Sequence, residues 1–374
     1  MTDKGQDEIQ QQGIYLGGQD AGSWHSLWPD RKEAVRRLKT DSVLYSRFRS
    51  LREDWQERLL DCMTGCKTLP LTYDPVFKKI FNADIHPERL SGLLSAVLGK
   101  DVTVHSILPA EEIMPGGGAL LIMDILVRLS DGSLANVEIQ KIPYLFPAER
   151  MSCYSADLLL REYSRARGEK GKGKFTYHNL KKVYTVVIFE ESPTGFWDEN
   201  RDKYFIHHGK TTFDTGLPME LLQEYYLIAL DVFRERHYTE DIYNTLEKPT
   251  ESRAEKNSLK AWLSLLAVSD MCEVDAVIRR YPWLEEIYRE MADYMHRQGE
   301  VIDMFSEALR ILDQNTVEYM VDEMREEINN QKAQIISQGR ELAEKDQLLV
   351  AREEEIKRLT ALLKKTQQNP TKNI

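Results

Sequence analysis

Residues 120–140 read LLIMDILVRLSDGSLANVEIQ, and this stretch decides how the chain is interpreted. Two apolar runs flank an Asp-Gly pair, a pattern typical of a β-hairpin turn. Each run carries one acidic residue, Asp124 in the first and Glu138 in the second. A carboxylate without a partner is costly to bury in an apolar strand. Two such carboxylates close together, with the polar Gln140 just beyond, indicate a site for a divalent metal ion.

The length of the hairpin turn decides whether the two carboxylates meet. A two-residue turn, 131–132, would place Asp124 opposite Ile139 and leave Glu138 on the other face. A three-residue turn, 130–132 with its glycine in the left-handed conformation, sets Asp124 directly opposite Glu138. Cross-strand neighbours project to the same face of an antiparallel pair. We therefore expect the three-residue turn.

The strand that follows the turn carries three polar residues on one face. Asn136, Glu138 and Gln140 are each two residues apart, and side chains of a strand alternate between its two faces. The same alternation directs Lys141 to the opposite face. The expected site therefore contains an amide, a carboxylate and a second amide, without a lysine from this strand.

An ordered set of residues resembles the PD-(D/E)-x-K nuclease superfamily. It runs from DPVFKKIF at 74–81 through Asp124 and Glu138-x-Gln140 to Arg150 and Tyr154. More narrowly, it is similar to the recombination-promoting nuclease and putative transposase family, in which glutamine commonly replaces the last lysine of the motif. The resemblance covers roughly residues 69–192. It implies an α/β fold, a restriction-endonuclease-like mixed sheet flanked by helices, and Mg²⁺-dependent DNA hydrolysis.

The resemblance also implies roles for individual residues. Asp124 and Glu138 would bind Mg²⁺ (or Mn²⁺), whose preferred ligands are carboxylate oxygens and water. Gln140 stands where the family's standard form has lysine, and an amide orients a water without taking its proton. Asp74 is assigned either to the catalytic set or to a helix N-cap before Pro75.

Arg150 and Tyr154 are four residues apart on an expected helix, 147–167, and so share one face of it. The resemblance turns that face toward the site, where Arg150 would contact phosphate. The alternative for this pair is a solvated arginine and a packed tyrosine.

A basic segment follows this helix. Between residues 161 and 182 there are eight basic residues and two acidic ones, in a chain whose net charge is −11. Such a segment is the best candidate for contacts with DNA phosphates, and a solvated loop is the alternative. The basic residues are Arg161, Arg165, Arg167, Lys170, Lys172, Lys174, Lys181 and Lys182.

Composition limits the remaining possibilities. The 374 residues are enough for several domains, and no apolar run approaches the roughly 20 residues of a membrane span. The four cysteines are too few and too scattered for a disulfide framework. We expect a cytoplasmic protein without a membrane partner.

Periodicity divides the chain into four expected domains: an N-terminal helical extension (1–66), a nuclease-like domain (67–235), a helical domain (236–315) and a coiled-coil helix (316–368). Within the second, residues 181–190 (KKVYTVVIFE) predict a central strand. Residues 168–174 predict a glycine–lysine loop, 203–208 a further strand, and 225–233 a strand leading into a helix.

The expected C-terminal helix has apolar residues at intervals of seven, which define one seam of a heptad repeat. The companion seam is mostly polar, so we expect a weak coiled coil that supports a homo-oligomer or binds a partner. The apolar seam residues are Val321, Ile328, Ile335, Leu342, Leu349, Ile356 and Leu363.

Two functions follow from these observations. The first is a metal-dependent DNA endonuclease of a transposase-related family. The second is a catalytically weak or inactive DNA-binding or scaffolding protein that keeps the fold and assembles through its C-terminal helix. Cleavage of RNA would point to a third class of enzyme.

Overall fold

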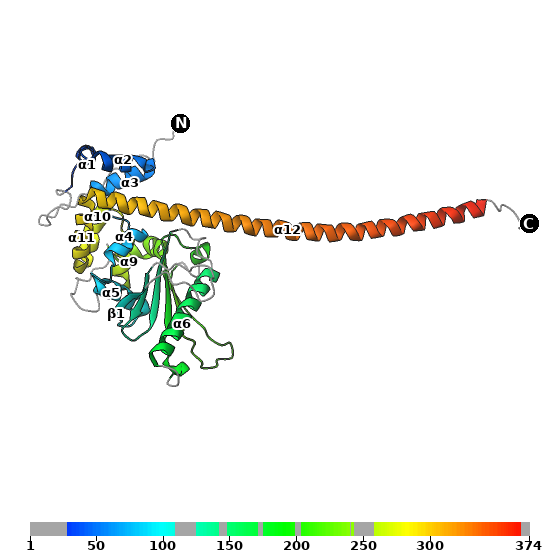
Figure 1. The fold of residues 1–374 in the computed structure, drawn as a ribbon, viewed down its shortest axis with the longest axis horizontal. Coiled ribbons are helices and arrows are strands. Elements are labelled where there is room, and N and C mark those ends of the chain that lie inside the picture. Colours follow the sequence, from blue (N-terminus) through cyan, green and yellow to red (C-terminus); the bar gives the residue numbers. More distant parts are fainter. Residues whose placement is uncertain are drawn as a thin grey trace, which may run out of the picture. The chain divides into compact units, whose positions relative to one another are not determined.

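The structure is a computed structural model that describes residues 28–108, 125–141, 148–170, 175–198, 203–239, 241–242 and 258–367 (Figure 1). Its α-helices are α1 (Arg31–Leu38), α2 (Ser42–Ser50), α3 (Glu53–Met63), α4 (Asp74–Ile80), α5 (Pro87–Leu98), α6 (Ala148–Lys170), α7 (Leu230–Phe233), α9 (Leu259–Ala267), α10 (Met271–Arg280), α11 (Glu285–His296) and α12 (Gln298–Gln367).

The strands form one six-stranded mixed sheet in the order β1-β2-β3-β4-β6-β5. The strands β1, β2 and β3 pair antiparallel, β3, β4 and β6 pair parallel, and β5 pairs antiparallel with β6 at the far edge. The strand bounds are β1 (Val104–Leu108), β2 (Ile125–Leu129), β3 (Leu134–Gln140), β4 (Val183–Phe189), β5 (Ile206–Lys210) and β6 (Gln223–Ala229).

The centre of the sheet is β4, as the sequence predicts. All seven of its residues are buried, and both of its neighbours run parallel to it. A strand covered on both faces needs apolar residues throughout, which explains the nearly uninterrupted VYTVVIF. The predicted strand leading into a helix is also confirmed, because β6 passes directly into α7.

The two faces of the sheet are covered by different helices. Tyr154 and Leu158 of α6 pack in one apolar cluster with Leu126 of β2 and with Val187 and Phe189 of β4. In Figure 1, α4, α5 and α9 lie on the side of the sheet away from α6. The α6 face is therefore separate from the face toward these three helices.

Two helix ends differ from the sequence predictions. Asp74 is the first residue of α4 and Tyr73 is its N-cap, so the N-cap prediction for Asp74 is wrong by one residue. The predicted loop at 168–174 begins too early, because α6 continues through Gly168 to Lys170. Ion pairs from Arg165 to Glu162 and to Glu169 bridge this last part of the helix.

The chain divides into two compact units, Met1–Arg310 and Ile311–Ile374. Within the first, the helices after residue 258 pack on earlier ones: the Phe81 and Trp262 ring centroids lie 5.8 Å apart, and those of Trp55 and Phe305 also lie 5.8 Å apart. The second unit contains the remainder of α12. No helix in the described part of the chain is long and apolar enough to cross a membrane.

Candidate metal centre

The hairpin turn between β2 and β3 has three residues, so the prediction of an odd-length turn is confirmed. The Leu129 N–H donates to the Ser133 carbonyl at 2.8 Å and closes the turn. Gly132 has φ +87°, in the left-handed region where glycine is favoured. The Ser133 N–H also donates to Oδ1 of Asp131 at 2.8 Å, which fixes the start of β3.

The register of this hairpin is described up to Ile125, which pairs with Val137. Asp124 lies outside the described residues, immediately before Ile125 in the chain. Its predicted partner, Glu138, is the next residue after Val137. The described ladder therefore ends one position short of the predicted pair.

Glu138 lies on the α6 face of the sheet, between two amides. Asn136, Glu138 and Gln140 alternate along β3 and are 0%, 1% and 8% exposed. Glu138 pairs across the parallel ladder with Val187, a residue of the α6 cluster. An ionised carboxylate at this depth requires compensation by opposite charge or by several hydrogen bonds.

Asn136 supplies one of these hydrogen bonds to Glu138, while its own amide oxygen accepts none from the described residues. Its Nδ2 donates to Oε1 of Glu138 at 3.2 Å. Its Oδ1 is buried and has no partner within the described part of the chain, and the same is true of Oγ1 of Thr185. Because Asn136 and Thr185 face each other on β3 and β4, these two unpaired oxygens belong to the same stretch of the α6 face.

The helix α6 brings its predicted pair of residues to this face. Tyr154 is 1% exposed and packs in the apolar cluster that includes Val187. The Arg150 guanidinium donates to the Tyr154 hydroxyl from Nε at 3.0 Å and from Nη2 at 2.8 Å. Tyr154 is therefore a packed tyrosine, which was the alternative predicted for it. Its hydroxyl also accepts hydrogen bonds from the guanidinium of Arg150.

Lys141 lies on the opposite face, as alternation predicts. Its Nζ is 3.0 Å from Oε2 of Glu190 and 3.4 Å from the centroid of the Tyr73 ring. Burial lowers the pKa of Lys141, and the adjacent Glu190 carboxylate opposes that shift. This lysine therefore does not replace the motif lysine at the α6 face.

Asp74 lies at the start of α4 and pairs with Lys78 one turn later, at 3.0 Å between Oδ1 and Nζ. The ring of the preceding residue, Tyr73, contacts Lys141. The start of α4 therefore lies near Lys141.

Most of the described basic residues of the 161–182 segment are bound by neighbouring side chains. Arg161 pairs with Asp157 at 2.7 Å, Arg165 with Glu162 at 2.7 Å, and Lys182 with Glu224 at 2.5 Å. Arg167 donates to the Tyr163 hydroxyl at 2.7 Å. Lys181 is exposed, whereas Lys172, Lys174 and the side chain of Lys170 lie outside the described residues.

This segment also lies far from Glu138 along β3. A Cβ built on Gly132 would meet Cγ of Lys181 at 3.5 Å and Nη2 of Arg165 at 3.8 Å, so both residues lie beside the hairpin turn. Glu138 lies six residues along the chain from Gly132, a distance of roughly 20 Å in extended conformation. The basic segment and the carboxylate therefore occupy opposite ends of the hairpin.

Polar residues that the sequence interpretation omitted also lie on the α6 face. Thr185 interrupts the apolar strand VYTVVIF, and this interruption is the signal that would have found it. Gln223 of β6 donates from Nε2 to Oγ of Ser155 on α6 at 2.9 Å. Ser155 is fully buried, and no local pattern identified it.

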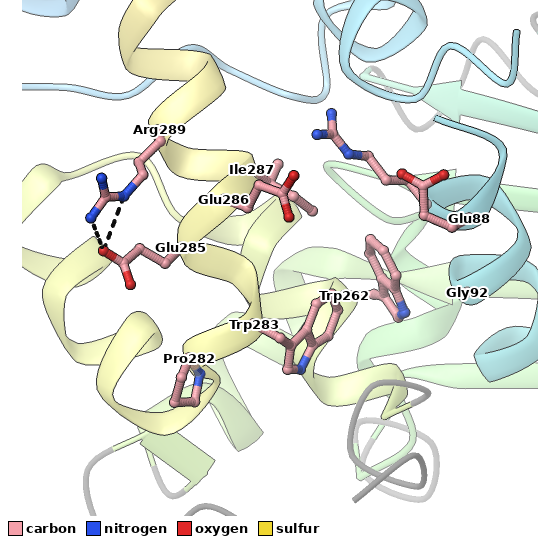
Figure 2. A pocket seen from close by; sticks show the side chains of 10 residues that line it. Glu88, Gly92, Trp262, Pro282, Trp283, Glu285, Glu286, Ile287 and Arg289 are labelled. Atoms are coloured by element: carbon pink, nitrogen blue, oxygen red, sulfur yellow. Dashed lines mark hydrogen bonds and ion pairs between the residues drawn. The ribbon is translucent and has the colours of Figure 1, made fainter. Parts of the chain in front are cut away.

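A hollow of about 760 Å³ lies elsewhere, between α5, α9 and α11. Trp262 and Trp283 line it with Glu88 and Glu286, and Glu138 is not among its lining residues (Figure 2). Among the described residues, no group of three or more His, Cys, Asp or Glu side chains is arranged to hold a metal ion.

Comparison with known proteins identifies the family. No curated protein and no solved structure gives a significant match to the chain. A family model described as PD-(D/E)XK nuclease family transposase matches residues 71–339. That range contains the six-stranded mixed sheet, the hairpin with Glu138, the helices α6, α9, α10 and α11, and the first part of α12. The chain therefore has a restriction-endonuclease-like core and belongs to the PD-(D/E)XK nuclease family transposases.

Proposed function

We propose that this protein is a metal-dependent DNA endonuclease whose Asp124 and Glu138 bind Mg²⁺ or Mn²⁺. The observation that carries the proposal is the three-residue turn with its described register. The described ladder begins with Ile125 opposite Val137, and the turn length predicted from the sequence would set Asp124 opposite Glu138. Directly opposite residues project to the same face, with Cβ atoms about 4.5–5.5 Å apart. Two carboxylates at that separation are able to share one ion.

The donor atoms on the α6 face fit such an ion. Glu138 offers carboxylate oxygens, and Asn136 contributes a buried Oδ1 that has no partner among the described residues. Oxygen donors of this kind suit Mg²⁺ and Mn²⁺. When bound, the ion supplies charge stabilisation at the scissile phosphate and lowers the pKa of a coordinated water.

The residues around the carboxylates orient the substrate and the water. Arg150, held by the Tyr154 hydroxyl, presents a guanidinium suited to a phosphate oxygen. Gln140 orients a water by hydrogen bonds, but its amide is not basic enough to accept a proton. We also keep Asp74, in the first turn of α4, in the proposed set as a carboxylate that helps to hold the ion or a water. Its side chain pairs with Lys78.

Nicking of supercoiled plasmid DNA tests the proposal. With Mg²⁺ or Mn²⁺, we expect cleavage by the wild type and a loss of at least about 100-fold in Glu138→Gln and Asp124→Asn, because each removes a charged ligand. Glu286→Gln, at the rim of the hollow in Figure 2, is the matched control and retains full activity. Unchanged cleavage in both site variants would overturn the site. Cleavage of RNA but not DNA would overturn the substrate.

A second function is favoured by one specific observation. Gln140 stands at the position of the motif lysine, and Lys141 is engaged with Glu190 on the opposite face. The second function is therefore DNA binding and assembly without efficient cleavage. A wild type that shifts DNA in a gel, yet cleaves neither DNA nor RNA with either metal ion, would establish it.

Both functions include self-association through the C-terminal helix, residues 316–368. We also propose that the chain is divided into four domains, with boundaries near residues 66, 235 and 315. Limited proteolysis tests it: cleavage concentrated at these boundaries supports separate domains. Release of a resistant fragment ending near Arg310 would instead join the first three parts into one folding unit.

A further inference from the structure

The second unit of the chain presents an exposed apolar stripe along α12. We call its residues, spaced by seven, the seam; those described are 49–67% exposed. A helix with such a stripe buries it against another helix when one is offered. The described seam residues are Ile328, Ile335, Leu342, Leu349, Ile356 and Leu363.

The residues three positions after each seam residue decide how a second copy of this helix is able to bind. In a parallel, in-register coiled coil each of these companion residues faces its own copy. Lys345 would then face Lys345, and Arg352 would face Arg352, inside the interface. Charges of the same sign, directly opposed and partly removed from water, oppose this arrangement. The companion residues are Met324, Gln331, Gln338, Lys345, Arg352 and Leu359.

An antiparallel arrangement removes both conflicts, because seam residues then face companion residues of the other copy. Centred near residue 340, it places Ile335 against Lys345 of the second copy and Ile328 against Arg352. Long basic side chains cover an apolar partner with their stems and keep their charged ends in water. At the end of the described stripe, Ile356 faces Met324, and that layer is apolar.

The charges that flank the stripe agree with the same register. Lys332 lies beside Asp346 of the second copy, and Arg325 lies beside Glu353, so both pairs are of opposite sign. Gly339 lies next to its own copy near the twofold axis and leaves space there. Like-charge pairs remain on the other flank, where Glu341 meets its own copy and Glu327 meets Glu355 of the second copy.

We propose that α12 binds a second copy of this chain as an antiparallel coiled coil with its twofold axis near residue 340. The proposal rests on the self-association proposed above and is independent of cleavage. Residue 311 of each copy lies about 29 residues from the axis, so the two copies of residue 311 lie roughly 90 Å apart. The two nuclease-like units are thus attached at opposite ends of the coil.

Disulfide cross-linking of the full-length chain tests the orientation. The exposed cysteines Cys66, Cys153 and Cys272 are first replaced by serine, and Ile356→Cys and Met324→Cys are then made separately. We expect a covalent dimer when the two variants are mixed and oxidised, and none from Ile356→Cys alone. In the proposed dimer, the two copies of position 356 are about 48 Å apart.

The other outcomes are distinct. A covalent dimer of Ile356→Cys alone would overturn the antiparallel orientation, and a dimer that gives no mixed cross-link would overturn the register. A monomer in sedimentation velocity would overturn self-association itself, whatever the nicking assay shows. Charge exchange adds an independent readout: Lys332→Glu weakens dimerisation about tenfold, and Lys332→Glu combined with Asp346→Lys restores it.

Discussion

Nδ2 of Asn136 lies 3.2 Å from Oε1 of Glu138, and both side chains are buried beneath α6. The amide therefore fixes one carboxylate oxygen. Because Oε1 is fixed, the orientation of the second carboxylate oxygen, Oε2, is set as well. A partner that fixes a metal-binding carboxylate in this way tunes its affinity for the metal.

Replacing Asn136 by valine removes this donor and the unpaired Oδ1 together. We expect the Mg²⁺ concentration for half-maximal cleavage to rise roughly 10–100-fold, because Glu138 loses the group that orients it. The free energy of unfolding should change by only about 1 kcal/mol. Thr185→Val, which removes the neighbouring unpaired hydroxyl, is the control and keeps the wild-type requirement for Mg²⁺. An unchanged requirement in Asn136→Val would contradict the role of the amide.

The change Gln140→Lys restores the lysine of the standard motif at the α6 face. A lysine at this buried position would have a lowered pKa and would accept a proton from a water. We expect single-turnover cleavage at saturating Mg²⁺ to become at least about tenfold faster and to increase with pH. Gln140→Leu can neither orient a water by hydrogen bonds nor accept its proton, so it should cleave more slowly than the wild type. A lysine variant slower than the wild type would show that Gln140 has a role of its own.

Lys141 gives a prediction for stability against pH. Burial lowers its pKa in the folded state below the ordinary value of 10.5, so the unfolded chain binds more protons between these two values. Stability of the wild type relative to Lys141→Met should therefore rise with pH through that window. Urea unfolding of both proteins at a series of alkaline pH values measures the difference. A difference that is constant across the series would show that the pKa of Lys141 is not lowered.

Gly132 should be sensitive to substitution by alanine, and Gly168 should not. Gly132 has φ +87°, so Gly132→Ala is expected to cost about 1–2 kcal/mol in the free energy of unfolding. Gly168 lies inside α6 with open space around it, so Gly168→Ala is expected to stabilise by about 0.5–1 kcal/mol. Thermal or urea unfolding of the two variants gives both values. Equal effects would show that the turn tolerates a side chain.

The basic segment predicts graded effects on DNA binding. Arg167 and the exposed Lys181 are not tied to carboxylates by any described ion pair of their side chains, unlike Arg161 and Arg165. If each contacts one phosphate, Arg167→Ala and Lys181→Ala should each reduce the slope of log K against log salt by about 0.9. Arg289→Gln, beside the hollow in Figure 2, is the control. Unchanged slopes in both variants would remove this segment from the DNA-binding surface.

The sequence predicted what local chemistry determines. The spacing of Gly132 from the acidic residues gave the three-residue turn, and alternation placed Lys141 on the far face. The helix α5 ends at Gly99 with φ +64°, the left-handed conformation in which glycine is favoured. These features depend on residues close together in the chain.

Contacts between residues far apart in the chain could not be predicted from local sequence patterns. The neutralisation of Lys182 comes from Glu224, on a strand 42 residues away. Arg161 is neutralised by Asp157, which lies just before the segment in which charges were counted. The burial of Ser155 depends on α6 packing against the sheet, where Gln223 of β6 donates to it, and no local pattern predicts this.

The buried apolar residues of β2 and β3, and not the turn alone, hold the register of this hairpin. A residue inserted at 130–132 would lengthen the loop to four residues, a common hairpin length, and leave Ile125 opposite Val137. A residue inserted within β3 before Glu138 would instead turn Glu138 to the opposite face of the sheet, because side chains of a strand alternate between its faces. The hairpin therefore tolerates length changes in its turn and not in its strands.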